Sequence, residues 1–225
     1  GIITMSGKEK EDNFQEEELG LLYNLALQTG VAVENARLNE DAEKTYFETI
    51  SALALAVEAK DRYSGGHLDR VADYAMRMAR KLNLSEEDIK TLRDSARLHD
   101  LGKIGILDEV LRKQGPLNEQ EWAMMRKHPE IGESIIKPIR SLSKLCDVIR
   151  HHHEKLDGSG YPDGLKGDQI SLLARILGVA DIFDALTTDR PYRKALSIEE
   201  AKKELFKMME GKLDCKVVDA LLETL

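Results

Sequence analysis

Apolar residues recur at intervals of three and four along most of this chain, and this spacing constrains its fold more than any other feature. Runs in which apolar and polar residues alternate are few, and clusters of β-branched residues are almost absent. Residues 157–168 (DGSGYPDGLKGD) are the exception, because four glycines and a proline there favour a loop. The pattern therefore predicts an all-α fold.

Capping residues and periodicity set the expected helix limits. Ser85 with Asp88 resembles a capping box, and Ser197 with Glu200 is a full capping box. Pro129 should end one helix or begin the next. The helices expected after residue 60 cover 67–82, 85–99, 118 to about 128, 143–153, 172–186, 197 to about 210, and a last segment that begins at Asp214.

A long helix is expected before these. From Leu19 to Val57 the apolar residues follow a three-and-four spacing that Glu40 and Glu43 interrupt. Two interpretations stay open: a signalling or dimerisation helix that feeds a downstream domain, or an ordinary amphipathic helix packed on its own core.

Composition excludes several classes of protein. The 225 residues, 42% of them apolar, suffice for one substantial core. The net charge of −8 and the scattered basic residues argue against extended nucleic-acid binding. No apolar stretch is long enough for a membrane span and no signal peptide is recognisable, so we expect a cytoplasmic protein without membrane contact. Cys146 and Cys215 show no metal-binding or disulfide spacing.

Histidine and aspartate carry the chemical signal. The chain has six histidines: His67, His99, His128, His151, His152 and His153. His99 precedes Asp100 at the end of an apolar helix, and Asp181 and Asp184 lie on another apolar helix. Burying carboxylates is costly unless a cation neutralises them. Imidazole and carboxylate without thiolate suit Fe, Mn, Zn, Co or Ni.

These residues suggest two metal ions. His67, His99, Asp100 and Asp181 would hold one, and His128 with the 151–153 run would hold a second that shares Asp100. Two metals about 3.5–4 Å apart activate water and stabilise the oxygens of a phosphoryl group in an in-line displacement. The hypothesis is phosphodiester hydrolysis.

Five ordered segments, SGGHLDRVADYA, ARLHDLGKIGI, RKHPEIG, HHHEKLDGSGYP and ARILGVADIFDALTTDRPYRKA, together resemble the HD-GYP subgroup of the HD phosphohydrolases. The resemblance covers about residues 47–225. It implies an HD-type helical bundle with a metal centre, and cyclic di-GMP as the substrate, opened to linear pGpG and in some members cut on to GMP.

The resemblance also assigns residues. The metal-ligand positions fall on His67, His99, Asp100, His128, His152, His153 and Asp181. His151 then becomes a structural residue, and Lys103 becomes a contact to the substrate phosphate that acts with Asp100 in catalysis. Asp184, Arg190 and Arg193 match the region for the guanine base and second phosphate. Arg175 would contact phosphate or, as we favour, pair with a carboxylate such as Asp184.

One position departs from part of the family. Some members with three metals carry a Glu four residues before the first histidine, where this chain has Tyr63. A neutral phenol is a poor ligand for a hard cation. We therefore expect two divalent metal ions, with Fe or Mn favoured over Zn, Co or Ni.

The segment FQEEELGLLYNLALQTGVAVENARL resembles the last helix of a GAF sensory domain. Residues 1–46 are then expected to be the end of a truncated GAF-like domain with a linker helix, and residues 47–225 the HD-GYP phosphodiesterase domain. The dimerisation interpretation of the long helix implies a homodimer through the N-terminal helix. The HD-GYP resemblance implies a diguanylate cyclase as a partner of the GYP loop.

Two alternatives to this enzyme stay open. A catalytically silent module would bind a cyclic dinucleotide or a partner protein and transmit a signal along the long helix. An HD hydrolase of another nucleotide would keep the chemistry and change the substrate.

Overall fold

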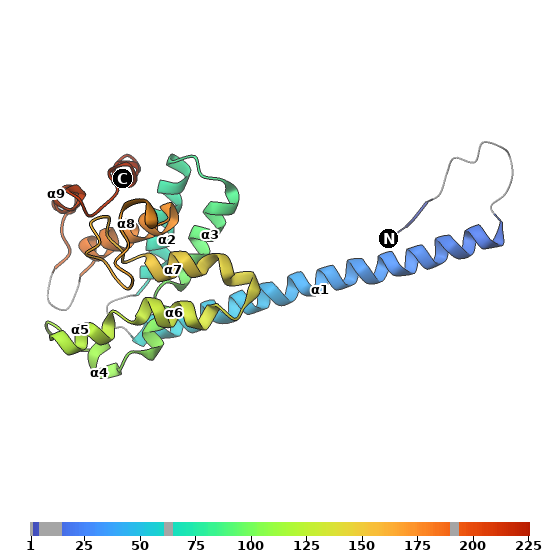
Figure 1. The fold of residues 1–225 in the computed structure, drawn as a ribbon, viewed down its shortest axis with the longest axis horizontal. Helices are drawn as coiled ribbons and strands as arrows, with labels where there is room; N and C mark the ends of the chain where they lie inside the picture. Colours follow the sequence, from blue (N-terminus) through green and yellow to red (C-terminus); the bar gives the residue numbers. More distant parts are fainter. Residues whose placement is uncertain (1, 5–14, 61–64, 190–193) are drawn as a thin grey trace. The chain divides into compact units, whose positions relative to one another are not determined.

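The computed structural model describes residues 2–4, 15–60, 65–189 and 194–225. Within these ranges the chain is helical without a β-strand, and one isolated bridge joins Asp157 to Lys166. The predicted all-α class is confirmed (Figure 1). The elements are α1 Glu16–Lys60, α2 His67–Lys81, α3 Glu86–Leu98, η1 Leu101–Gly105, α4 Asp108–Leu111, α5 Glu119–Met125, α6 His128–Ile136, η2 Arg140–Leu145, α7 Cys146–His151, η3 Gly167–Gln169, α8 Leu172–Thr187, α9 Ile198–Met209 and α10 Cys215–Leu222.

Helix starts follow the predicted caps. Ser85 accepts a hydrogen bond from the Asp88 amide, and Ser197 forms a complete capping box with Glu200. Asn118 also forms a box, because its side chain accepts from the amide of Glu121 and the Glu121 carboxylate accepts from the amide of Asn118. Pro129 lies in the first turn of α6, where a proline sacrifices no hydrogen bond.

One predicted helix is wrong in its limits. The expected helix over residues 143–153 is a 3₁₀ segment, η2, followed by α7, which ends at His151. His152 and His153 therefore follow the helix end instead of continuing on its surface. This change of direction decides where their rings lie.

The packing divides the chain into two compact units, residues Gly1–Glu48 and Thr49–Leu225, with the boundary inside α1. Along the described length of α1 the buried residues are Ile50, Ala54 and Val57, all in its last turns. Large apolar side chains earlier in the helix are exposed, Leu21 by 72% and Val31 by 61%. No helix in the described ranges is both long enough and apolar enough to span a membrane.

The core of the second unit lies among α2, α3, α8, α9 and α10. Its largest buried side chains include Met78, Leu92, Phe183 and Leu205, and the Tyr74 ring packs edge-on against Phe183. Next to this core, α6 packs on η1 and on α7. These contacts bring α2, the end of α3, α6, the end of α7 and α8 around one point.

Two glycines permit this convergence. A Cβ atom at Gly102 would overlap the backbone of His128, and one at Gly178 would lie 2.5 Å from the carbonyl oxygen of His152. Glycine alone allows such close approach of two backbones. The first contact sets α6 against the segment after Asp100, and the second sets the end of α7 against α8.

Candidate metal centre

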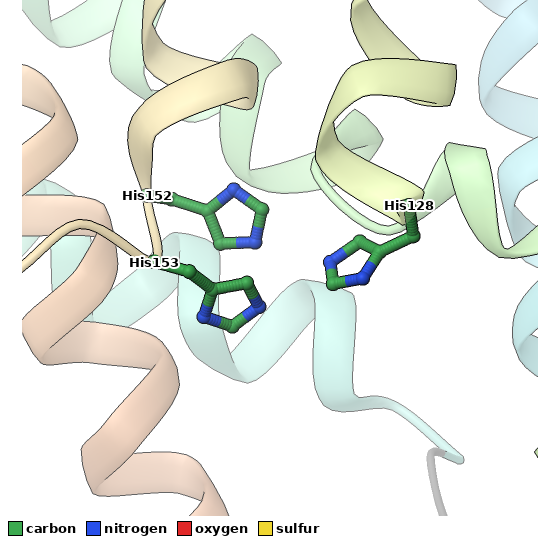
Figure 2. Close-up of side chains that lie close together, drawn as sticks. All are labelled: His128, His152 and His153. Atoms are coloured by element: carbon green, nitrogen blue, oxygen red, sulfur yellow. The ribbon is translucent and has the colours of Figure 1, made fainter. Parts of the chain in front are cut away.

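All seven predicted ligand residues lie in one cluster. Three groups of donor atoms each fall within 4.8 Å of one another: His128, His152 and His153; His67, His99 and Asp181; and His99, Asp100 and His152. Figure 2 shows the rings of His128, His152 and His153 facing one another, the first from the start of α6 and the other two from the end of α7. The residues come from five segments of the chain.

The two carboxylates lie between the histidines. Asp100 Oδ2 lies 3.6 Å from Nε2 of both His67 and His99, while its Oδ1 lies 3.6 Å from Nε2 of His128. Asp181 is placed similarly, with Oδ1 3.5 Å from His67 Nε2 and Oδ2 3.9 Å from His153 Nδ1. Each carboxylate thus faces both groups of imidazoles, a role the sequence suggested for Asp100 alone.

Helix ends orient three of the histidines. The Nδ1–H groups of His99, His128 and His152 donate to the carbonyl three residues earlier, at Ala96, Met125 and Ile149, over 2.8, 2.9 and 2.7 Å. The last turn of a helix leaves such carbonyls without an amide partner. Each ring therefore satisfies a helix end with Nδ1 and turns Nε2 into the cluster.

The orientation of these rings fits a metal site. Among the described residues, Nε2 of His128 and of His152 are buried and lack a hydrogen-bond partner. Burial lowers the pKa of His128 to about 4, so its ring is neutral and carries a lone pair near neutral pH. Buried, unpartnered lone pairs are costly unless a cation binds them. The His and Asp set of this cluster is therefore suited to holding a divalent metal ion.

Lys103 adds a positive charge at the edge of the cluster. Its Nζ lies 2.6 Å from Asp100 Oδ2. Burial alone would raise the pKa of Asp100, but Lys103 and the neighbouring histidines hold it well below its usual range. Asp100 is therefore a carboxylate, and Lys103 lies beside the space that the donors surround.

Asp184 occupies a place behind His67. Its carboxylate accepts from His67 Nδ1 at 2.7 Å and from Arg70 Nε at 2.6 Å, and its side chain is only 1% exposed. A carboxylate on the far nitrogen of a ligand histidine fixes the ring and its tautomer. This role, and the part of Arg70 in it, were missed by sequence reasoning; the His67–Arg70 spacing of one helical turn was the available signal.

Arg175 corrects a prediction. The predicted pairing of Arg175 with Asp184 is wrong. Arg175 pairs instead with Asp214 at 3.0 Å and with Asp168 at 2.9 Å, and its Nε donates to the Ile170 carbonyl. Arg175 and Asp184 are nine residues apart on α8, which is about 13.5 Å along a helix. Arg175 therefore ties the 167–170 segment to the start of α10.

Three residues with predicted roles, Tyr63, Arg190 and Arg193, lie outside the described residues. His151, the histidine not assigned as a ligand, bonds Asp147 at 2.8 Å and Asp163 at 3.0 Å. Its ring is therefore held on the side of the 157–168 loop. The ring centroid of Tyr161, in that loop, lies 4.7 Å from that of His153, and the guanidinium carbon of Arg126 lies 5.6 Å from the same Tyr161 centroid.

Glu154 organises the same loop, a role that the sequence did not reveal. Its carboxylate is buried and accepts from the amides of Asp163, Gly164 and Leu165 at 2.7, 3.0 and 3.1 Å. Backbone amides that face one carboxylate lose their acceptor when that carboxylate is removed. Glu154 therefore fixes the loop that carries Tyr161 over His153.

We expect Glu154→Ala to destabilise the protein by about 3 kcal/mol, because three amides lose a charged acceptor. Urea unfolding followed by circular dichroism measures this loss, and Glu130→Ala, which removes an exposed carboxylate from α6, is the control. A Glu154→Ala variant as stable as the control would contradict the role of Glu154 in the loop.

Comparison with known proteins identifies a family and several relatives of this chain. A family model described as HD domain matches residues 51–217. The chain is 40% identical over 206 residues to the 3'3'-cGAMP-specific phosphodiesterase 2 of Vibrio cholerae, covering 90% of this chain and 38% of that relative. It is 42% identical over 189 residues to the cyclic di-GMP phosphodiesterase response regulator RpfG of Xanthomonas campestris, covering 83% of this chain and 50% of that one.

The chain thus spans half or less of the length of these two curated relatives. Among solved structures, its fold is similar to that of Bd1817, a HDG"Y"P protein from Bdellovibrio bacteriovorus, with a TM-score of 0.61 at 23% identity. That match covers 81% of this chain and 61% of the other.

Proposed function

This chain belongs to the HD domain family, and on that premise we propose that it is a metal-dependent cyclic dinucleotide phosphodiesterase of the HD-GYP subgroup. The observation that carries the proposal is Asp100, whose two oxygens face two different groups of histidines. A carboxylate in this position suits a pair of metal ions that act on one phosphodiester.

The cluster divides into two ligand sets. His67, His99, Asp100 and Asp181 would hold one divalent ion, and His128, His152 and His153 with Asp100 would hold the second. When bound, the ions would act as Lewis acids on phosphoryl oxygens and lower the pKa of water. The donors are nitrogen and oxygen without thiolate, a set that suits Fe, Mn, Zn, Co or Ni, and of these Fe and Mn are the metals we propose.

Lys103 supplies a positive charge that comes from a side chain of the protein and not from a metal ion. Its ammonium is held beside Asp100 at 2.6 Å, at the edge of the donor cluster. A compact cation in this place can neutralise negative charge as it builds on a non-bridging phosphate oxygen. The ion pair keeps the ammonium in position before a substrate arrives, so it need not reorganise during the reaction.

The substrate is proposed to be cyclic di-GMP, with linear pGpG and then GMP as products. Relatives named for 3'3'-cGAMP make that dinucleotide the second candidate. The test is to purify the protein without oxygen, load it separately with Mn²⁺ and Fe²⁺, and follow both dinucleotides and their products over time. Metal-loaded protein that bound either dinucleotide but hydrolysed neither would favour a silent receptor.

We expect two metal ions for each chain, because in the sequence Tyr63 occupies the position, four residues before His67, at which HD-GYP members with three metals carry a Glu. Elemental analysis of carefully loaded protein, together with anomalous scattering, counts the ions and locates them. A reproducible third site would overturn this number.

The exposed apolar residues of α1 support a further proposal, that a second copy of the chain covers them in a homodimer. Residues 1–46 would then be the end of a GAF-like domain that passes its signal along α1, and a diguanylate cyclase would bind the GYP loop. Sedimentation of the parent and of a Leu25→Glu, Val33→Glu double variant tests the dimer, which should be lost in the variant.

A further inference from the structure

The start of α2 lacks a cap of its own. The first amides of a helix have no partner within the helix, and a side chain just before the helix usually accepts from them. Here that position is Gly66, which has no side chain to offer. Helix α2 begins directly with His67, so whatever caps the helix also fixes the backbone of a candidate ligand.

Glu58 provides the missing cap from another helix. Its Oε1 accepts from the His67 amide at 2.7 Å and from the Leu68 amide at 3.4 Å. A carboxylate at a helix N-terminus is also favoured by the helix dipole. Glu58 belongs to the last turns of α1, so the end of α1 holds the first residue of α2.

The end of α1 is itself anchored. Val57, next to Glu58, is 4% exposed and Ala54 is 3% exposed. The carbonyl of Lys60 accepts from Arg112 Nε at 3.2 Å, and the Lys60 ammonium lies 3.4 Å from Asp108 Oδ1. Glu58 therefore projects from a helix end that these contacts hold in place.

His67 is thus held at two points. Asp184 binds its ring through Nδ1 at 2.7 Å, and Glu58 binds its backbone amide at 2.7 Å. The Nε2 atom that remains lies 3.5 Å from Asp181 and 3.6 Å from Asp100. Loss of either anchor would leave this nitrogen free to move relative to the two carboxylates.

We propose that Glu58 is a positioning residue through which the C-terminal end of α1 sets His67, so that the metal affinity of the centre depends on a residue outside it. The inference rests on the metal centre of the proposed function. It also gives α1 a defined route to the site: a displacement of its last turn moves the cap, and the cap moves the ligand.

The experiment is a Mn²⁺ titration by calorimetry of the full chain and three Glu58 variants. Glu58→Gln keeps an oxygen at the same reach and should bind Mn²⁺ as the parent does. Glu58→Ala removes the acceptor and Glu58→Asp withdraws it by one methylene, and both should weaken Mn²⁺ binding about tenfold, as other changes just behind metal ligands do. Glu48→Gln, on an exposed stretch of α1, is the matched control.

Amide hydrogen exchange of residues 67 and 68 supplies a second readout. Both amides should exchange faster than in the parent in the Ala and Asp variants, and at the parent rate in the Gln variant. Parent-like affinity in Glu58→Ala, or an equal loss in the Gln variant, would overturn the proposal. If Glu58→Ala does not fold, the contrast between Gln and Asp decides. Protein that shows this contrast but hydrolyses no cyclic dinucleotide would refute the proposed function and leave the role of Glu58 standing.

Discussion

Replacing Asp100 by Asn is expected to abolish turnover and metal binding together. The amide removes the negative charge and offers one oxygen where the carboxylate offers two, and the two oxygens of Asp100 face different histidines. It also removes the negative charge that lies 2.6 Å from the ammonium of Lys103. Changes to residues behind a metal ligand cost about 10–100-fold in affinity, so loss of a shared ligand should cost more than about 100-fold.

Elemental analysis after loading measures the bound metal, and hydrolysis of cyclic di-GMP measures turnover. Asp73→Asn is the matched control, because Asp73 is half exposed and pairs with Arg77 on the outside of α2. An Asp100→Asn protein that kept two metal ions at the affinity of the parent would refute the shared-ligand role.

Replacing Lys103 by Ala should separate metal binding from catalysis. None of the donor atoms is lost, so the metal content should stay that of the parent. The rate should fall about 10²–10³-fold, the usual cost of removing one group that stabilises developing charge. Metal analysis and the hydrolysis rate, measured on the same preparation, give both quantities.

Lys144→Ala is the control for this variant, because Lys144 is 69% exposed and pairs with Glu87 away from the cluster. Hydrolysis by Lys103→Ala at the parent rate would show that the phosphate role is wrong. Loss of metal in Lys103→Ala would instead show that the ammonium serves mainly to hold Asp100.

The sequence predicted the helices well where local chemistry determines them. Ser85, Ser197 and Asp214 begin helices as their side chains indicate, because a cap depends on residues a few positions away. The end of α7 was predicted two residues too late. At that end Gly178 of α8 approaches the His152 carbonyl closely, and such a contact between distant segments is not visible in the local pattern.

Pairings between residues far apart in the sequence were harder to predict. Arg175 was expected to find Asp184 because both lie on one predicted helix, yet the rise of α8 separates them and Asp214, 39 residues further on, takes the place. The supporting roles of Glu58, Arg70 and Glu154 were not predicted, since their partners are backbone amides or residues far along the chain.

The amino-acid sequence by itself determined the all-α class and the residue types of the cluster, because helical periodicity and the pairing of His with Asp are visible one segment at a time. The tertiary structure decided which atoms face one another: that Asp181 lies between two groups of imidazoles, as was predicted for Asp100 alone, and that Glu58 and Asp184 hold His67 from opposite ends. The physical reason is that hydrogen-bond geometry over a few ångströms depends on how five segments pack, and packing is a property of the whole core.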